Sequence, residues 1–148
     1  MVTIDKKPKK LTSSFFEKYS NCPEIMEKTS RQYCIAILSI DGIKFAIPFR
    51  THIRHRYCYL FLNSPRGSKA GLDFTKSVVV TDDAYIGTDA TIESKEYSEF
   101  INKSAVIANQ FENFISDYKK WVKDPDYYHK NELLAFSALQ YFHDELGI

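Results

Sequence analysis

The stretch YCIAILSIDGIKFAIPFR, residues 33–50, decides the fold of this 148-residue chain. Its first run, residues 33–40, is rich in β-branched and aromatic residues, and Asp41-Gly42 is a dipeptide typical of tight hairpin turns. The return run, residues 43–49, carries Pro48, which indicates the edge or the end of a strand. The stretch therefore predicts a β-hairpin.

Further strands follow the hairpin. Residues 57–62 predict a third strand, residues 72–80 a fourth, and Tyr85-Ile86 a short fifth. Before the hairpin, the capping-box pattern that begins at Ser14 predicts a short helix from about Phe15. Residues 1–12 are basic and polar, and we expect them to be frayed, with residues 1–10 flexible.

The C-terminal half changes to a helical period. Apolar residues recur every three or four positions over residues 95–122, with Ser94 as the cap and Asp124-Pro125 as the end. At 1.5 Å per residue, this pattern predicts one rod of about 40 Å. A last helix is expected over residues 131–143, with these residues packing inward: Leu133, Leu134, Phe136, Leu139 and Phe142. We expect Trp121 and the apolar stripe from Phe111 to Tyr118 to serve helix packing and not to form a base-stacking platform.

These elements predict an α+β fold, with a small antiparallel sheet or barrel flanked by helices. The length fits one domain over residues 1–148. Apolar residues make up 44% and charged residues 26%, which excludes a disordered, collagen-like or membrane-embedded chain. The aromatic content of 15% is high, and aromatic rings either fill a core or stack on bases.

The net charge of +1 conceals an asymmetry. Residues 1–76 hold 14 Lys and Arg against 6 Asp and Glu, whereas residues 77–148 hold 6 against 13. A basic half is typical of a surface that binds nucleic acid. The simpler interpretation is that the two halves attract each other within one domain, and both can hold at once.

The cysteines and the N-terminus bear on the compartment. Cys22, Cys34 and Cys58 form an odd count without a Cys-x-x-Cys pair, which predicts buried free thiols in a reducing compartment. The N-terminal lysines precede no apolar run, so we expect no signal peptide. No apolar stretch is long enough for a membrane span. We therefore expect a cytoplasmic protein.

The segment RTHIRHRY, residues 50–57, is the densest in chemistry. It holds three arginines and two of the four histidines of the chain: Arg50, Arg54 and Arg56, with His52 and His55. An extended backbone would place the arginines and His52 on one face, whereas a helical turn would bring the two histidines together. Either geometry places an imidazole beside a guanidinium.

This combination suits RNA cleavage without a metal ion. The 2′-hydroxyl loses a proton as it attacks phosphorus, and the leaving 5′-oxygen gains one. Histidine, with an ordinary pKa of about 6.5, can serve in either step. An arginine fork can stabilise the charge that gathers on the phosphate.

Simpler interpretations of this segment are a solvated strand end or a plain binding surface. His52 and His55 have a spacing that fits metal ligands, but the neighbouring arginines would repel a dication, so we expect no metal and no cofactor. Lys76 could meet a phosphate or lie on a strand edge. Arg31 could reach the same pocket from before the first strand.

The order of these features resembles the toxin subunits of type III toxin–antitoxin systems, and within them the TenpN branch, relatives of ToxN, CptN and AbiQ. The resemblance covers about residues 10–142. It is carried by Tyr33-Cys34, Phe45-Ala46-Ile47-Pro48-Phe49-Arg50, His52, His55, Tyr57-Cys58, Gly71-Leu72-Asp73-Phe74-Thr75-Lys76 and Leu139-Gln140-Tyr141-Phe142.

The resemblance implies an antiparallel barrel of the MazF and Kid kind, SH3-like in form, with helices around it. It implies a metal-independent, sequence-preferring endoribonuclease that leaves a 2′,3′-cyclic phosphate and a 5′-hydroxyl. It also implies inhibition by a small repeated antitoxin RNA, which the toxin cuts and then binds in a closed protein–RNA assembly.

The chain departs from this family at the site. Related toxins have a Thr-Ser pair and a lysine after the equivalent strand. Arg50-Thr51 falls on the pair, and the lysine has no exact match, with His52, Arg54 and His55 as the alternatives for it. Arg31 occupies the place of a lysine that precedes the first strand in that branch.

The residues and the resemblance together predict the roles at this site. Arg50 would stabilise the scissile phosphate and Thr51 would orient it, while His52 and His55 would be base and acid in an order left open. The RNA backbone would be contacted by Arg31, Arg54, Arg56 and Lys76. The alternatives are a non-catalytic nucleic-acid-binding module of the same fold and a protein-interaction domain that poisons a host enzyme.

Overall fold

The predicted hairpin forms the centre of the sheet. Strands β3 (Cys34–Ile40) and β4 (Ile43–Arg50) pair in antiparallel register from Ile35 opposite Pro48 to Ile40 opposite Ile43. Asp41 has φ +51° and Gly42 has φ +86°, so both turn residues are left-handed, as a type I′ turn requires. The prediction of the hairpin and its turn is confirmed.

The computed structural model describes residues 2–25, 34–124, 126 and 135–148. Its other strands are β1 (Val2–Ile4), β2 (Lys9–Leu11), β5 (Cys58–Leu60), β6 (Gly71–Asp73), β7 (Val78–Val80) and β8 (Ile86–Asp89). Its helices are α1 (Ser13–Lys18), α2 (Ser94–Asn102), α3 (Ser104–Lys123) and α5 (His143–Leu146), with 3₁₀ turns η1 (Phe74–Lys76), η2 (Asp83–Tyr85) and η3 (Ala138–Phe142). The predicted α+β class is confirmed.

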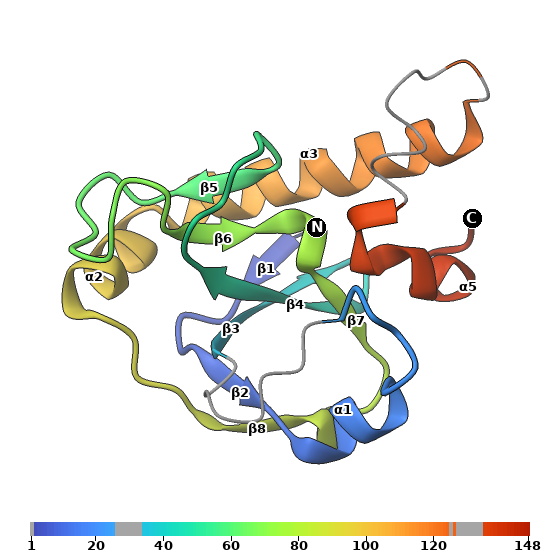
Figure 1. Ribbon diagram of the computed structural model, residues 1–148, viewed down its shortest axis with the longest axis horizontal. Helices are drawn as coiled ribbons and strands as arrows, with labels where there is room; N and C mark the ends of the chain where they lie inside the picture. Colours follow the sequence, from blue (N-terminus) through green and yellow to red (C-terminus); the bar gives the residue numbers. More distant parts are fainter. Residues whose placement is uncertain (1, 26–33, 125, 127–134) are drawn as a thin grey trace.

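The strands form one eight-stranded antiparallel sheet with the order β5-β6-β4-β3-β2-β8. Off this path, β1 pairs with β3 and β7 with β4. Figure 1 shows α3 running along one side of the sheet, beside β5 and β6, and α1 near β8 at the opposite side. Within the described residues the path is open, because β5 and β8 end it without pairing with each other.

The N-terminal segment contains two strands where the sequence predicts fraying. Val2 pairs opposite Ile40, and Lys9 pairs opposite Ile35, so β1 and β2 lie side by side along β3. Three-residue strands are too short to show a period in the sequence. Their structure depends on the exposed edge of β3 that they cover.

Both predicted helix caps are wrong, although the helices form. Thr12 precedes α1, and its hydroxyl shares a 2.8 Å hydrogen bond with Ser14 in place of a capping box. Glu93 caps α2 in place of Ser94, because its carboxylate accepts the backbone N–H of Glu96 at 2.9 Å.

The predicted fourth strand over residues 72–80 is interrupted. The Asp73 carboxylate accepts the backbone N–H of Thr75 at 3.0 Å, which bends the chain into η1 between β6 and β7. The two pieces pair with different ends of β4, Leu72 opposite Phe49 and Val79 opposite Phe45. The predicted fifth strand is η2 followed by β8, which begins at Ile86.

The predicted single rod over residues 95–122 is two helices, because Lys103 ends α2 and begins α3. Each helix has its own partner. The buried Glu96 carboxylate accepts both Nε and Nη2 of Arg66, at 2.5 and 2.8 Å, and Glu99 accepts the Tyr59 hydroxyl at 2.8 Å. The bonds to Arg66 fix α2 to the loop between β5 and β6, and the bond to Tyr59 fixes it to β5. Helix α3 packs against the sheet. The predicted end of the rod at Asp124 is confirmed.

The C-terminal segment is not the continuous helix predicted over residues 131–143. Among the described residues, Ala135 and Phe136 are helical, Ser137 interrupts the helix, and η3 and α5 follow, while Leu133 and Leu134 lie outside the described residues. Leu139 and Phe142 are buried as predicted. Phe136 is helical but 62% exposed, contrary to the prediction that it packs inward.

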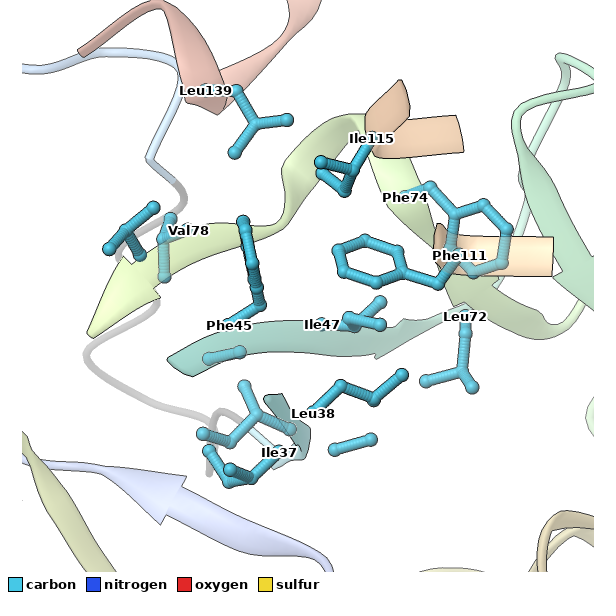
Figure 2. Close-up of a cluster of buried hydrophobic side chains, with 14 of the residues drawn as sticks. Ile37, Leu38, Phe45, Ile47, Leu72, Phe74, Val78, Phe111, Ile115 and Leu139 are labelled. Carbon is cyan, nitrogen blue, oxygen red and sulfur yellow. The ribbon is translucent and has the colours of Figure 1, made fainter. Parts of the chain in front are cut away.

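The hydrophobic core lies between the sheet and α3. Figure 2 shows Phe74 and Phe111 beside Phe45 and Ile47 of β4. The Phe111 ring meets Phe45 and Phe74 edge to face, with ring centroids 5.2 and 5.3 Å apart. This contact joins α3 both to the hairpin and to the turn that follows Asp73.

Ion pairs join the basic half of the chain to the acidic half. Among the described residues, they are Arg66–Glu96, Lys9–Asp89 and Lys44–Asp83. The charge asymmetry therefore serves, in part, to hold the two halves together. The three cysteines are free and half-buried, and none of the helices in the described ranges has both the length and the apolar character of a membrane span.

Gly71→Ala tests the close approach of β6 to β5. A Cβ added at Gly71 would lie 1.9 Å from the backbone oxygen of Tyr59, so the strands would have to separate. We expect a loss of about 1–3 kcal/mol in the free energy of unfolding, measured by urea titration of Trp121 fluorescence. Ser68 is exposed in the loop just before β6, and Ser68→Ala should change the free energy of unfolding by less than about 0.5 kcal/mol. Equal stability of the two variants would contradict this account of the packing.

Candidate functional site

A buried carboxylate organises the site that the sequence points to. The Asp73 side chain has no exposed surface. Its Oδ1 accepts the Thr75 hydroxyl at 2.6 Å and the Thr75 backbone N–H at 3.0 Å, and its Oδ2 accepts Nη1 of Arg50 at 2.5 Å. Arg50 ends β4 and Asp73 ends β6, and these two strands pair with Arg50 opposite Gly71. The sheet register therefore brings the guanidinium to the carboxylate.

His55 binds the same carboxylate, through Nε2 at 3.0 Å from Oδ1. The backbone N–H of Tyr57 donates to Nδ1 at 3.1 Å, so Nδ1 carries a lone pair. The ring proton is therefore on Nε2, where it points at Asp73. Both nitrogens of His55 are engaged, and we call Asp73, Arg50, His55 and Thr75 the Asp73 cluster.

The surroundings of Asp73 keep it charged. Burial raises its pKa, but hydrogen bonds from His55 and Thr75 and the positive charge of Arg50 outweigh burial, and the pKa lies below the ordinary value of 3.8. An ionised carboxylate can bind Arg50 firmly. The cluster is thus a fixed acceptor with a cation on one side and an imidazole on the other.

Thr51 and His52 form a bend beside the cluster. His52 has φ +59°, a left-handed conformation that is uncommon outside glycine and marks a constrained position. Its Nδ1 shares a 3.0 Å hydrogen bond with the Thr51 hydroxyl. The next residue, Ile53, is buried and donates its N–H to the backbone oxygen of Lys69, which holds the bend in place.

The bend gives His52 a different environment from His55. The side chain of His52 is exposed, and its Nε2 has no partner among the residues that the structure describes. The two histidines therefore do not form the adjacent pair that a helical turn would give. One imidazole is fixed by Asp73, and the other faces solvent with a nitrogen available for proton transfer.

The remaining predicted site residues lie outside the Asp73 cluster. Lys76 donates to the backbone oxygen of Phe136 at 2.7 Å, and burial lowers its pKa, with Asp73 and Arg50 close enough to act on it electrostatically. Arg54 is exposed. Arg56 is also exposed and lies over the Tyr57 ring, 5.2 Å from its centroid. Arg31 lies outside the described residues.

Asp73 and Thr75 are the site residues that the sequence did not reveal as such. Asp73 stands in the predicted fourth strand and within the motif Gly71-Leu72-Asp73-Phe74-Thr75-Lys76, but the sequence pattern predicts no role for it. A signal was present in Asp73-Phe74-Thr75, because aspartate two residues before threonine is a common side-chain turn. The turn explains the bend, but the partners Arg50 and His55 are 23 and 18 residues away, beyond any local pattern.

In the described part of the chain, no group of three or more His, Cys, Asp or Glu side chains is placed to hold a metal ion.

Comparisons with protein-family models, with curated proteins and with solved structures give no match for this chain.

Asp73→Asn should disrupt the cluster. The amide keeps the shape of the side chain but removes the charge and leaves Arg50 without its buried counter-ion. We expect a loss of about 3 kcal/mol in the free energy of unfolding, measured by urea titration. Asp83→Asn is the matched control, because Asp83 pairs with Lys44 at the surface with 79% of its side chain exposed, and it should cost at most about 1 kcal/mol. Equal costs for the two variants would contradict the central role of Asp73.

The stabilisation by Asp73 should depend on pH. Because its pKa is lowered on folding, its contribution is fully present above the ordinary aspartate value of 3.8 and is lost as the pH falls below that value, through the pKa of the folded protein. The difference in unfolding free energy between wild type and Asp73→Asn should therefore be constant near neutral pH and shrink in acid. A difference that grows in acid would show the opposite sign of the shift.

Proposed function

We propose that this chain is a metal-independent endoribonuclease, the toxin of a type III toxin–antitoxin system similar to the TenpN branch. The observation that carries the proposal is the Asp73 cluster beside the bend of Thr51 and His52. It combines a guanidinium fixed by a buried carboxylate with an exposed imidazole two residues along the chain. These are the groups that transesterification of an RNA phosphate requires.

Arg50 acts on the phosphate. One nitrogen of its guanidinium is bound to Asp73, which leaves the other donors of the fork for the non-bridging oxygens. Because the guanidinium is already held, little conformational entropy is lost when RNA binds. Thr51, the next residue, lies where its hydroxyl can orient the same group.

His52 takes the proton of the 2′-hydroxyl. Its Nδ1 is held by Thr51 and its Nε2 is open, as a general base needs. As the O2′–P bond forms and the P–O5′ bond breaks, the 5′-oxygen needs a proton, and Lys76 is the donor. Its ammonium donates to the backbone oxygen of Phe136, and its lowered pKa favours proton release. The products are a 2′,3′-cyclic phosphate and a 5′-hydroxyl.

His55 is a positioning residue in this proposal. Both of its nitrogens are used, one by the backbone of Tyr57 and one by Asp73, so its place is to hold the carboxylate that holds Arg50. This assignment divides the two histidines, whose roles the sequence leaves open. The exposed Arg54 and Arg56 contact the RNA backbone, and binding should weaken as salt increases.

The resemblance supplies the biological part of the proposal. It places the protein in the cytoplasm, with cellular RNA as substrate and a small repeated antitoxin RNA as inhibitor, bound in a closed protein–RNA assembly. A sheet related to the MazF and Kid barrels belongs to the same proposal. The open path between β5 and β8 is compatible with a curved sheet that stops short of closure.

His52→Asn tests the catalytic assignment. Asparagine tolerates a left-handed backbone, so the bend is preserved while the titrating imidazole is removed. The protein is freed of bound RNA by unfolding and refolding, and end-labelled mixed-sequence RNA is then incubated with it in EDTA. We expect wild type to give cyclic-phosphate products and His52→Asn to cleave at least about 100-fold more slowly, with RNA affinity changed only slightly.

His52→Gly with added imidazole is the control for this experiment. Free imidazole should restore part of the cleavage if the lost group is the base itself. Cleavage by His52→Asn at the wild-type rate would show that His52 is not the base. If the wild-type protein binds RNA and leaves it intact, the chain is the non-catalytic binding module, and an absence of RNA binding would favour the protein-interaction domain.

A further inference from the structure

A hollow of about 320 Å³ adjoins the Asp73 cluster, between the start of β5 and one face of α3. Tyr57 forms the wall that the two share. Its ring centroid lies 6.0 Å from that of His55, and its backbone oxygen accepts the N–H of Phe74, the residue that follows Asp73. Figure 1 shows β5 running beside α3 in this part of the molecule. A group in the hollow would therefore lie next to the phosphate site.

Aromatic rings line the inner part of the hollow. Tyr57 contacts Phe114 and Trp121 of α3, with ring centroids 5.9 and 5.5 Å apart. The packing predicted for Trp121 is thus correct, but the residue also lines this hollow and is half-buried. Tyr57 and Trp121 are half-buried, and partly exposed rings stack unpaired bases in proteins that bind single-stranded RNA, a role beyond the packing expected of Trp121.

A polar edge completes the hollow. Gln110, Asn113 and Asp117 follow one another at intervals of three and four residues, so they lie along one face of α3. All three are exposed, and their side chains make no hydrogen bond or ion pair with any other residue that the structure describes. Their donors and acceptors are available to a ligand.

We propose that this hollow binds one unpaired guanine of the RNA and makes Asp117 a specificity-determining residue, an inference that rests on the proposed function. A carboxylate only accepts hydrogen bonds. Guanine presents two adjacent donors, N1–H and the 2-amino group, whereas each of the other bases places an acceptor beside its donor. Asp117 repels a phosphate at the α3 edge of the hollow, whereas Arg56, which lines its other side, can contact the phosphate of the bound nucleotide.

The amides fit the rest of the same base. Asn113 precedes Asp117 by one helical turn, and its NH₂ can donate to O6 of a guanine whose N1–H and 2-amino group point at the carboxylate. Stacking on the rings supplies affinity for any base, and the edge contacts supply the choice among bases. The nuclease would then prefer RNA with a guanine beside the scissile bond.

Binding of short RNAs tests this inference without cleavage. Fluorescence anisotropy compares a 2′-O-methyl octamer of uridines that carries one central guanosine with the same octamer carrying inosine, which lacks the 2-amino group. Without a 2′-hydroxyl to attack the phosphate, neither probe is cut by the wild-type protein. We expect wild type to bind the guanosine RNA about 5-fold or more tightly than the inosine RNA, and Asp117→Asn to bind the two equally. Glu112→Gln, on the same helix but outside the hollow, should keep the preference.

The outcomes separate this inference from the proposed function. Equal binding of both RNAs by wild type, or an unchanged preference in Asp117→Asn, overturns the guanine pocket, and cleavage in EDTA would still stand. A guanine preference in a protein that cuts no RNA overturns the nuclease and leaves the pocket. An absence of binding to either RNA overturns both. Because Asp117 is exposed, the variant should melt at the wild-type temperature, which excludes misfolding as the cause.

Discussion

The Asp73 carboxylate is the interaction on which the rest of the site depends. Its buried oxygens need hydrogen-bond donors, since an unpaired charge in the core would cost several kcal/mol. Those donors come from three parts of the chain: Thr75 in the turn that follows, Arg50 at the end of β4, and His55 in the segment before β5. Satisfying one side chain thus interrupts a strand, fixes a guanidinium and orients an imidazole.

Asp73 and the groups bound to it have different roles in the proposed function. Burial makes Asp73 a structural acceptor, and it leaves the groups on its outer side, Arg50 and the bend at His52, to meet a substrate. The left-handed backbone at His52 and the buried Ile53 after it keep the bend rigid. The neighbouring hollow on α3 adds an aromatic surface with a carboxylate edge. These are the proposed phosphate site and the proposed base site, and Tyr57 lies between them.

The sequence predicts the elements that local chemistry determines. The hairpin turn needs left-handed residues, and Asp41-Gly42 supplies them, so its position is predictable. The density of arginines and histidines in residues 50–57 indicates that this segment is the candidate site. The turn at Asp73 has a local signal in Asp73-Phe74-Thr75, but its partner Arg50 is 23 residues away and is not predictable in this way. The break at Lys103 has no local signal of this kind, and α2 before it is held by a distant loop through Glu96. Local propensity favours a continuous strand and a continuous helix at these places.

Nitrogen NMR of the histidine side chains tests the central claim most directly. Long-range ¹H–¹⁵N spectra at neutral pH distinguish which ring nitrogen carries the proton. The account predicts that His55 is fixed in the tautomer protonated at Nε2, with Nδ1 as an acceptor, and that Asp73→Asn alters this signal while His52 is unaffected. A wild-type His55 protonated at Nδ1, or averaged between its tautomers, would contradict the claim that Asp73 organises the site.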